Sequence, residues 1–84
     1  MWADRPASGI VELDLHGKNV YQARLAIDAL LRRSAGAARI RLIHGSSRGT
    51  ALRDMIWDEY RENVKVLRLI KISPDITDLV LKEL

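Results

Sequence analysis

The sequence contains two histidines, and both stand in the same local pattern. Each follows a short apolar segment and precedes a glycine, in LDLHG at 13–17 and in RLIHG at 41–45. Asp14 lies two residues before His16, and strand residues two apart share a side, so the carboxylate can orient or charge the imidazole. Such a histidine can move a proton near neutral pH, and His44 could bind a phosphate or act as the opposite acid. The alternative is that each histidine caps a helix or bonds a loop carbonyl.

The loop that begins with the second histidine has the composition of a phosphate-binding loop. Residues 44–50, HGSSRGT, supply two glycines for close backbone approach, two serine hydroxyls and an arginine, just before an expected helix. Free amides and the positive end of a helix dipole attract phosphate at such a place. The loop is not a P-loop, because the G-x-x-x-x-G-K-[ST] spacing and its lysine are absent. The candidate phosphate contacts in this loop are Gly45, Ser46, Ser47, Arg48 and Gly49.

Positive charge is concentrated in one block of the sequence. The net charge is +3, yet residues 29–53 contain no acid and carry six arginines. The planar guanidinium fork suits phosphate oxygens, so the block favours an anionic partner such as nucleic acid. The alternative is that two of these arginines end a helix and the others pair with nearby acids. The six are Arg32, Arg33, Arg39, Arg41, Arg48 and Arg53.

The apolar pattern predicts the elements that must position these side chains. Residues 11–15 alternate apolar and polar side chains, which is typical of a half-buried strand. Asn19 can cap the helix that follows, with Gln22 reaching back to form a capping box. The expected elements, in order, are strand 11–15, helix 19–34, strand 39–43, helix 50–63, strand 64–72 and strand 76–81, with a turn at 73–75.

This order predicts an α/β fold of the two-layer sandwich type, β-α-β-α-β-β. Right-handed crossovers that progress in one direction place both helices on one face of a four-stranded mixed sheet, whose last two strands form a hairpin. The other face stays open. We expect it, with the loops after the first two strands, to collect the candidate side chains. These are Asp14, His16, His44, Arg39, Arg41 and Arg48.

Length and composition limit the protein class. The chain of 84 residues is 48% hydrophobic, which predicts one small globular domain. No apolar run reaches the roughly 18 residues that span a bilayer, so we expect a cytoplasmic monomer without a membrane partner. The absence of cysteine excludes thiol nucleophiles and cysteine-ligated zinc. Aromatic residues are absent from the expected strands, and Trp57 and Tyr60 are expected to pack the second helix.

Three segments of the sequence resemble the Smr domain, the small MutS-related module. They are LDLHG, the helix segment YQARLAIDALL and the segment IRLIHGSSRGTALR. The resemblance covers residues 10–84 and leaves 1–9 as an N-terminal extension of a stand-alone Smr protein. Family members usually carry H-G-K-G-x-G-x-L-R in the second block. Here Ser46 and Ser47 replace the lysine and the next glycine, and the loop is one residue longer.

The resemblance implies both a fold and an activity. The fold is a two-layer sandwich like the C-terminal domain of bacterial translation initiation factor three. Several Smr domains are endonucleases that nick DNA or cleave RNA, which implies a nicking or structure-selective endonuclease acting on DNA or structured RNA. Carried over by position, the catalytic candidates are Asp14, His16 and His44, and Gly45, Gly49 and Arg53 belong to the same site.

Two alternatives to catalysis follow from the same residues. The altered loop favours a module of the same fold that binds nucleic acid or docks on a ribonucleoprotein without cleaving it. In a protein-interaction module, Arg39 and Arg41 would only neutralise Glu12 and Asp14. No metal ligand set is predicted, although a divalent cation such as Mg²⁺ or Mn²⁺ could take part in cleavage.

Overall fold

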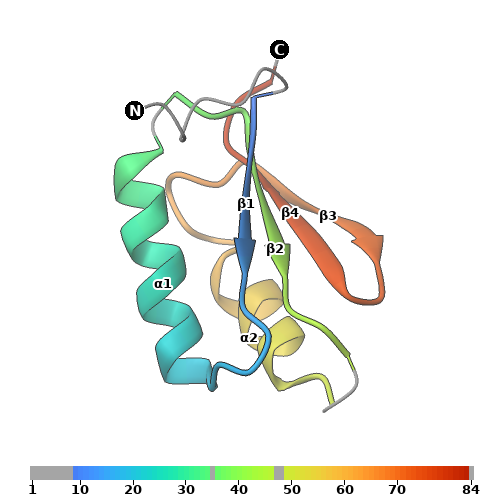
Figure 1. Ribbon diagram of the computed structural model, residues 1–84. Helices are drawn as coiled ribbons and strands as arrows, with labels where there is room; N and C mark the ends of the chain where they lie inside the picture. The colour runs from blue at the N-terminus through green and yellow to red at the C-terminus, as the bar shows by residue number, and fades with distance from the viewer. Residues whose placement is uncertain (1–8, 35, 47–48, 84) are drawn as a thin grey trace.

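The computed structural model describes residues 9–34, 36–46 and 49–83, and its elements follow the predicted order (Figure 1). The sheet order is β1-β2-β4-β3, with β1 parallel to β2 and β4 antiparallel to both of its neighbours. The predicted mixed sheet of four strands is confirmed. The elements are β1 (Ile10–Asp14), α1 (Val20–Arg33), β2 (Arg39–Ile43), α2 (Ala51–Glu59), β3 (Arg68–Ser73) and β4 (Ile76–Val80).

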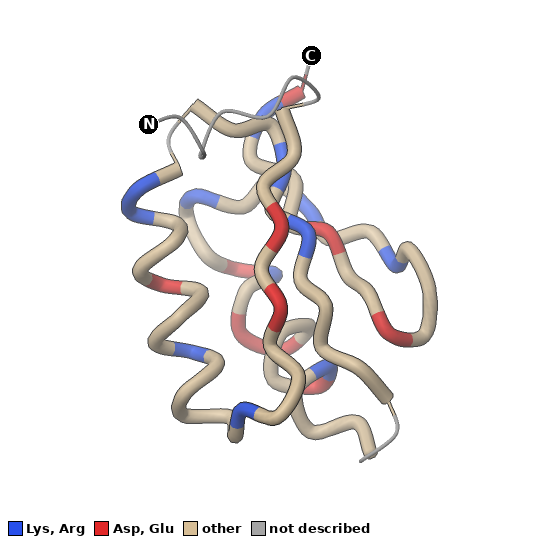
Figure 2. The backbone as a smooth tube through the Cα atoms, viewed as in Figure 1, with Lys and Arg blue, Asp and Glu red and all other residues tan. Residues whose placement is uncertain are grey.

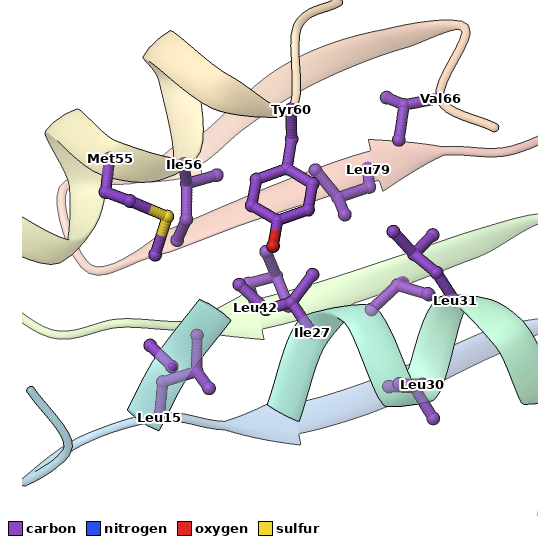
Figure 3. Close-up of a cluster of buried hydrophobic side chains, with 12 residues drawn as sticks. Leu15, Ile27, Leu30, Leu31, Leu42, Met55, Ile56, Tyr60, Val66 and Leu79 are labelled. Atoms are coloured by element: carbon purple, nitrogen blue, oxygen red, sulfur yellow. The ribbon is translucent and has the colours of Figure 1, made fainter. Parts of the chain in front are cut away.

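The hydrophobic core lies between the sheet and the two helices. Leu15, which directly follows β1, and Leu42 of β2 meet Ile27 of α1 and Ile56 of α2 (Figure 3). All four are fully buried. Glu12, in contrast, is exposed, as the alternating pattern of β1 predicts. One face of the sheet therefore carries the core.

Helix α1 begins and ends where its sequence predicts. The Asn19 side chain accepts from the backbone N–H of Gln22 at 2.8 Å, and the Gln22 side chain accepts from the Asn19 N–H at 3.0 Å. This reciprocal capping box satisfies two N–H groups that the helix itself leaves unpaired. Arg32 and Arg33 occupy the last turn, where cations favour the negative end of the helix dipole.

The second helix and the third strand are shorter than predicted. Helix α2 ends at Glu59, and β3 begins at Arg68 instead of residue 64. The β-branched side chain of Val64 is 96% exposed. The length of β4 limits the length of β3. Strand β4 has five residues, and its last residue, Val80, pairs with Arg68 at the start of β3. Residues 64–66 therefore have no opposite strand, whatever their propensity.

The helices of the described residues can be compared with a membrane-spanning helix. No helix within residues 9–34, 36–46 and 49–83 has the length and the apolar character that crossing a membrane requires. Helix α1, the longer of the two, has 14 residues and an exposed polar side.

Candidate functional site

The loops that follow β1 and β2 border one depression of about 430 Å³. They lie at the same end of the sheet, where both parallel strands finish (Figure 1). The first loop contributes residues 16–20 to the lining, and the second contributes 44–46, 49 and 51–52. Both histidines line this depression, which we call the histidine pocket. The expectation that the two His-Gly segments are spatial neighbours is therefore confirmed.

Each histidine is followed by glycine because the backbone turns there. Gly17 and Gly45 have φ angles of 81° and 74°, in the left-handed region. A Cβ atom at either position would meet no atom within 4 Å, so space is not the constraint. The constraint is backbone conformation, which costs a residue with a side chain roughly 1–2 kcal/mol. The repeated glycine thus turns the chain from strand to loop beside the pocket.

Asp14 and His16 form a hydrogen-bonded pair at the pocket edge. One carboxylate oxygen, Oδ1 of Asp14, accepts from the backbone N–H of His16 at 3.0 Å and lies 2.9 Å from Nδ1 of its ring. The backbone bond, and after it the ring bond, lower the pKa of Asp14. A carboxylate can only accept, so Nδ1 carries the proton and Nε2 is left for other partners. The His16 side chain is 80% exposed, so this second nitrogen is accessible.

His44 is held differently, inside the pocket wall. Its ring is 5% exposed, with Nε2 3.0 Å from Thr77 Oγ1 and Nδ1 3.0 Å from the carbonyl oxygen of Gly45. Because a carbonyl oxygen only accepts, Nδ1 carries a proton, and Nε2 is hydrogen-bonded to the Thr77 hydroxyl. Trp57 Nε1 in turn donates to Thr77 Oγ1 at 3.1 Å. Both ring nitrogens of His44 are therefore engaged within the protein.

The difference between the two histidines follows from strand alternation. Ile40, Leu42 and His44 are two apart and share the core side of β2, whereas Leu15 on the core side of β1 directly precedes His16. The second histidine thus continues the apolar series of its strand, and the first does not. This signal was present in the sequence, but the common His-Gly pattern concealed it.

Arg39 and Arg41 lie away from the histidine pocket, on the opposite face of the sheet. Arg41 donates to Asp78 through Nε at 2.8 Å and Nη2 at 3.0 Å, and Arg39 donates through Nη1 at 3.1 Å. The Asp78 side chain is 0% exposed. The expectation that these two arginines leave the core side of β2 is confirmed. They pair with Asp78 of β4 and do not line the histidine pocket, and their contact with phosphate stays a prediction.

Three arginines of the acid-free block, Arg39, Arg41 and Arg53, are paired with acids that lie outside the block. Arg53 donates to the adjacent Asp54, which lies just beyond the block. Figure 2 shows Lys and Arg spread over the tube, with Asp and Glu on neighbouring strands. Two candidate phosphate contacts, Ser47 and Arg48, lie outside the described residues.

The described part of the second loop is tied to the β3–β4 turn. The backbone N–H groups of His44 and Gly45 both donate to the carbonyl oxygen of Asp75, at 2.9 and 3.0 Å. The hydroxyl of Ser46 donates to the Asp75 carboxylate. Gly49 has a φ angle of 100° and donates its N–H to the carbonyl of Ser46 at 3.3 Å. The Asp75 carboxylate beside this loop was not predicted from the sequence, because Asp75 is 29 residues away from Ser46 along the chain.

The charges around the histidine pocket suit an anion. Among the described residues that line it, none is acidic, and Lys18 contributes an exposed ammonium group. The first residues of both helices, Val20 of α1 and Ala51 of α2, also line the pocket. The first N–H groups of a helix have no intrahelical partner, and the dipole makes that end positive. Two helix N-termini and a lysine thus converge on one depression.

A metal ion would find few protein ligands at this pocket. Within the described chain, no three side chains of His, Asp or Glu are placed to hold an ion together. Asp14 and His16 are bonded to each other, and the His44 ring is engaged in the wall. A Mg²⁺ or Mn²⁺ ion here would therefore depend on water and substrate phosphate for most of its oxygen ligands.

Comparisons with known proteins identify the family. The family model of the Smr domain matches residues 13–75. The fold is similar to the crystal structure of the Smr domain of Thermus thermophilus MutS2, with a TM-score of 0.77 and 30% sequence identity, over 87% of this chain and 99% of that one. No curated protein matches the sequence. Because the family model covers more than half of the chain, the protein belongs to the Smr domain family.

Proposed function

We propose that this protein is a nucleic-acid-cleaving Smr domain, a nicking or structure-selective endonuclease. The Smr family is a family of nucleic-acid-interacting domains. The observation that carries the proposal is the Asp14–His16 pair, in which Nδ1 lies 2.9 Å from the carboxylate and Nε2 stays accessible beside a pocket suited to an anion. A fixed imidazole next to an anion site has the parts that phosphodiester hydrolysis requires.

In this proposal, Lys18 and the N-terminal ends of α1 and α2 bind the phosphate in the histidine pocket. Lys18 supplies a mobile positive charge, and the N-terminal ends of α1 and α2 supply N–H groups and two dipoles. Negative charge grows on the phosphoryl oxygens as the nucleophile attacks, so these groups favour the transition state over the bound substrate. His44 serves as a positioning residue, because its bonds to Thr77 and Gly45 hold the loop that borders the phosphate.

Proton transfer is assigned to His16. Its Nε2 takes a proton from the attacking oxygen, which is water for DNA and water or a ribose hydroxyl for RNA. As the new P–O bond forms, the bond to the leaving oxygen breaks, and that oxygen receives a proton from the imidazolium or from solvent. Asp14 fixes the ring through Nδ1 and stabilises its positive charge. Proton transfer of this kind is worth about 10²- to 10⁴-fold in rate.

The test is cleavage of supercoiled DNA and of structured RNA, with Mg²⁺, Mn²⁺ or EDTA present. We expect His16→Ala and Asp14→Asn each to lower the cleavage rate by about 10²-fold or more while leaving binding unchanged. Asp58→Asn is the matched control, because Asp58 is an exposed aspartate of α2 that does not line the pocket. Absence of cleavage by the parent, or full activity of His16→Ala, would contradict the enzymatic proposal.

A second function is favoured by the second loop. The carboxylate of Asp75 accepts from Ser46 at the pocket wall, which places a negative charge near the expected phosphate. His44 offers no free nitrogen, so His16 has no imidazole partner to protonate the leaving oxygen. Both features suit a module that binds DNA, RNA or a ribonucleoprotein without cutting it. That outcome predicts salt-sensitive binding without cleavage under any metal condition.

A further inference from the structure

A second depression of about 250 Å³ lies between α2 and the β3–β4 hairpin. Its lining consists of Arg53, Trp57, Lys71, Ser73 and Thr77. Every one of these side chains ends in an N–H or O–H group, and none of them is acidic. We call this depression the α2 groove. Its composition is that of an anion site, and it is separate from the histidine pocket.

We propose that the α2 groove binds a backbone phosphate of the same nucleic acid that places another phosphate in the histidine pocket. The inference rests on the proposed function, because it extends that substrate along the protein surface. In this inference, the side chains of Arg53, Lys71 and Ser73 contact the phosphate. Trp57 also lines the groove, where its indole N–H donates to Thr77.

The positive charges in and beside the groove come from three side chains. Lys71 is exposed and makes no ion pair within the described part of the chain. Arg53 donates to Asp54 through Nε and Nη2, which leaves Nη1 for another acceptor. The guanidinium of Arg61 lies 5.8 Å from the centre of the Trp57 ring. Phosphate is the ligand that such a cluster would hold best.

The hydroxyl groups of the groove differ in what they can offer a ligand. Thr77 is 1% exposed, and its hydroxyl is already bonded to both His44 and Trp57, so it has no role in holding a ligand. Ser73 Oγ accepts the backbone N–H of Asp75 at 3.2 Å, and its own hydrogen has no acceptor among the described residues. Ser73 can therefore donate to a phosphate oxygen that Lys71 holds.

The position of the groove favours nucleic acid over an unrelated anion. Helix α2 borders both depressions, because Ala51 and Leu52 line the histidine pocket and Arg53 and Trp57 line the groove. A hydrogen-bond chain from Trp57 through Thr77 to His44 joins the two walls. A polyanion with regularly spaced charges can occupy both depressions at once, which one small anion cannot do.

The test uses Trp57 as its own reporter. In a Trp2→Phe background, Trp57 is the remaining tryptophan of the chain, so its fluorescence follows occupancy of the groove. The probe is a short single-stranded oligonucleotide, titrated at several salt concentrations. We expect Arg53→Ala with Lys71→Ala to raise Kd by about tenfold and to reduce the log–log salt slope by about 0.7, the value for one lost phosphate contact on a single strand.

Two controls separate the possible outcomes. Lys82→Ala removes an exposed lysine outside the groove and should change Kd by less than about twofold. Lys65→Ala, at a second exposed lysine outside the groove, should likewise leave the Trp57 titration unchanged. If the parent binds and cleaves nucleic acid but the double variant keeps its Kd and salt slope, the groove inference is wrong and the proposed function stands. Equal binding of a glutamate-rich peptide would assign the groove to a protein partner instead. A parent that binds no oligonucleotide overturns both proposals.

Discussion

Replacing Asp78 by asparagine should destabilise the fold more than any other single charge change among the described residues. The Asp78 side chain is 0% exposed and accepts three guanidinium N–H groups, at 2.8, 3.0 and 3.1 Å. Asn keeps the volume and one acceptor oxygen. It loses the charge, however, and turns an amide NH₂ toward the donors of Arg39 and Arg41. The substitution therefore removes the buried carboxylate that both cations share, and Arg41 keeps the exposed Glu12 of β1 as a more weakly acting negative neighbour.

The size of the effect follows from burial. Breaking a fully buried ion pair costs about 3–5 kcal/mol. The side chains of Arg39 and Arg41 remain 34% and 26% exposed, so water recovers part of their solvation. We therefore expect a loss of about 3 kcal/mol in the free energy of unfolding, the lower end of that range. A domain of this size has a total of roughly 5–15 kcal/mol, so the loss is large.

Urea unfolding of the parent and of two matched variants measures this effect. Glu59→Gln is the control, because Glu59 accepts two bonds from Arg24, both at 2.8 Å, with both side chains exposed at 43% and 37%. An exposed pair of this geometry contributes about 0.2–1 kcal/mol. We expect the Asp78 variant to lose about 1–3 M in urea midpoint at an unchanged slope, since slopes are about 1–3 kcal/mol per molar.

Nucleic-acid binding by Asp78→Asn and by a further variant, Arg41→Ala, tests whether Arg39 and Arg41 serve the fold or bind nucleic acid. If they are structural, Arg41→Ala lowers the urea midpoint but leaves the affinity for duplex DNA or structured RNA unchanged. Asp78→Asn then frees two cations, so it raises the affinity and steepens the salt dependence. The reasoning fails if Asp78→Asn and Glu59→Gln cost the same. It also fails if Arg41→Ala reduces the salt slope by about one without loss of stability.

Three further predictions concern the core, the pH dependence of stability and the site. Leu15→Ala should cost about 2–5 kcal/mol, because Leu15 is fully buried between the sheet and the helices, and a urea melt measures the loss. Burial, and after it the 2.7 Å bond to Asp28, raise the pKa of Tyr60, so the phenol stays protonated in the fold after the unfolded chain begins to ionise near pH 10. The free energy of unfolding should therefore fall above about pH 10, and Tyr60→Phe should abolish this fall while costing about 1 kcal/mol at neutral pH. The double variant of Asp14→Asn with His16→Ala should cleave no more slowly than either single variant, because both serve one proton transfer; additive losses in rate would separate their roles.

The predicted fold was correct because its local signals agree with one another. The capping residues, the alternation in β1 and the apolar face of α1 each specify one element, and all three specify the same layers. The errors in the predicted element boundaries occur where the structure of a residue depends on the segment that pairs with it. Val64 has strand propensity, but β4 is too short to pair with it. Propensity describes a residue, whereas strand length describes a pair of segments.

The distribution of charge could not be predicted for the same reason. Arg39 and Arg41 belong to an acid-free run of the sequence, but antiparallel pairing sets Arg41 opposite Asp78. Such a pair is 37 residues apart along the chain, so no local window contains it. Lys18, a lone lysine before α1, was not singled out, although it lines the pocket in which the site was expected. A count of charge along the sequence is thus a poor guide to charge on the surface.

The two His-Gly segments show what the sequence can specify about chemistry. Their shared glycine specifies the same backbone turn, and it brings both histidines to one pocket. The direction of each histidine side chain depends on one further feature, the number of residues between the histidine and the last core residue before it. This core residue directly precedes His16, as Leu15, but lies two positions before His44, as Leu42. Because strand side chains alternate, the first ring faces solvent on the Asp14 side and the second enters the core side, where Thr77 binds it. Counting from the last buried residue therefore separates a histidine that is exposed beside the pocket from one that is buried in its wall.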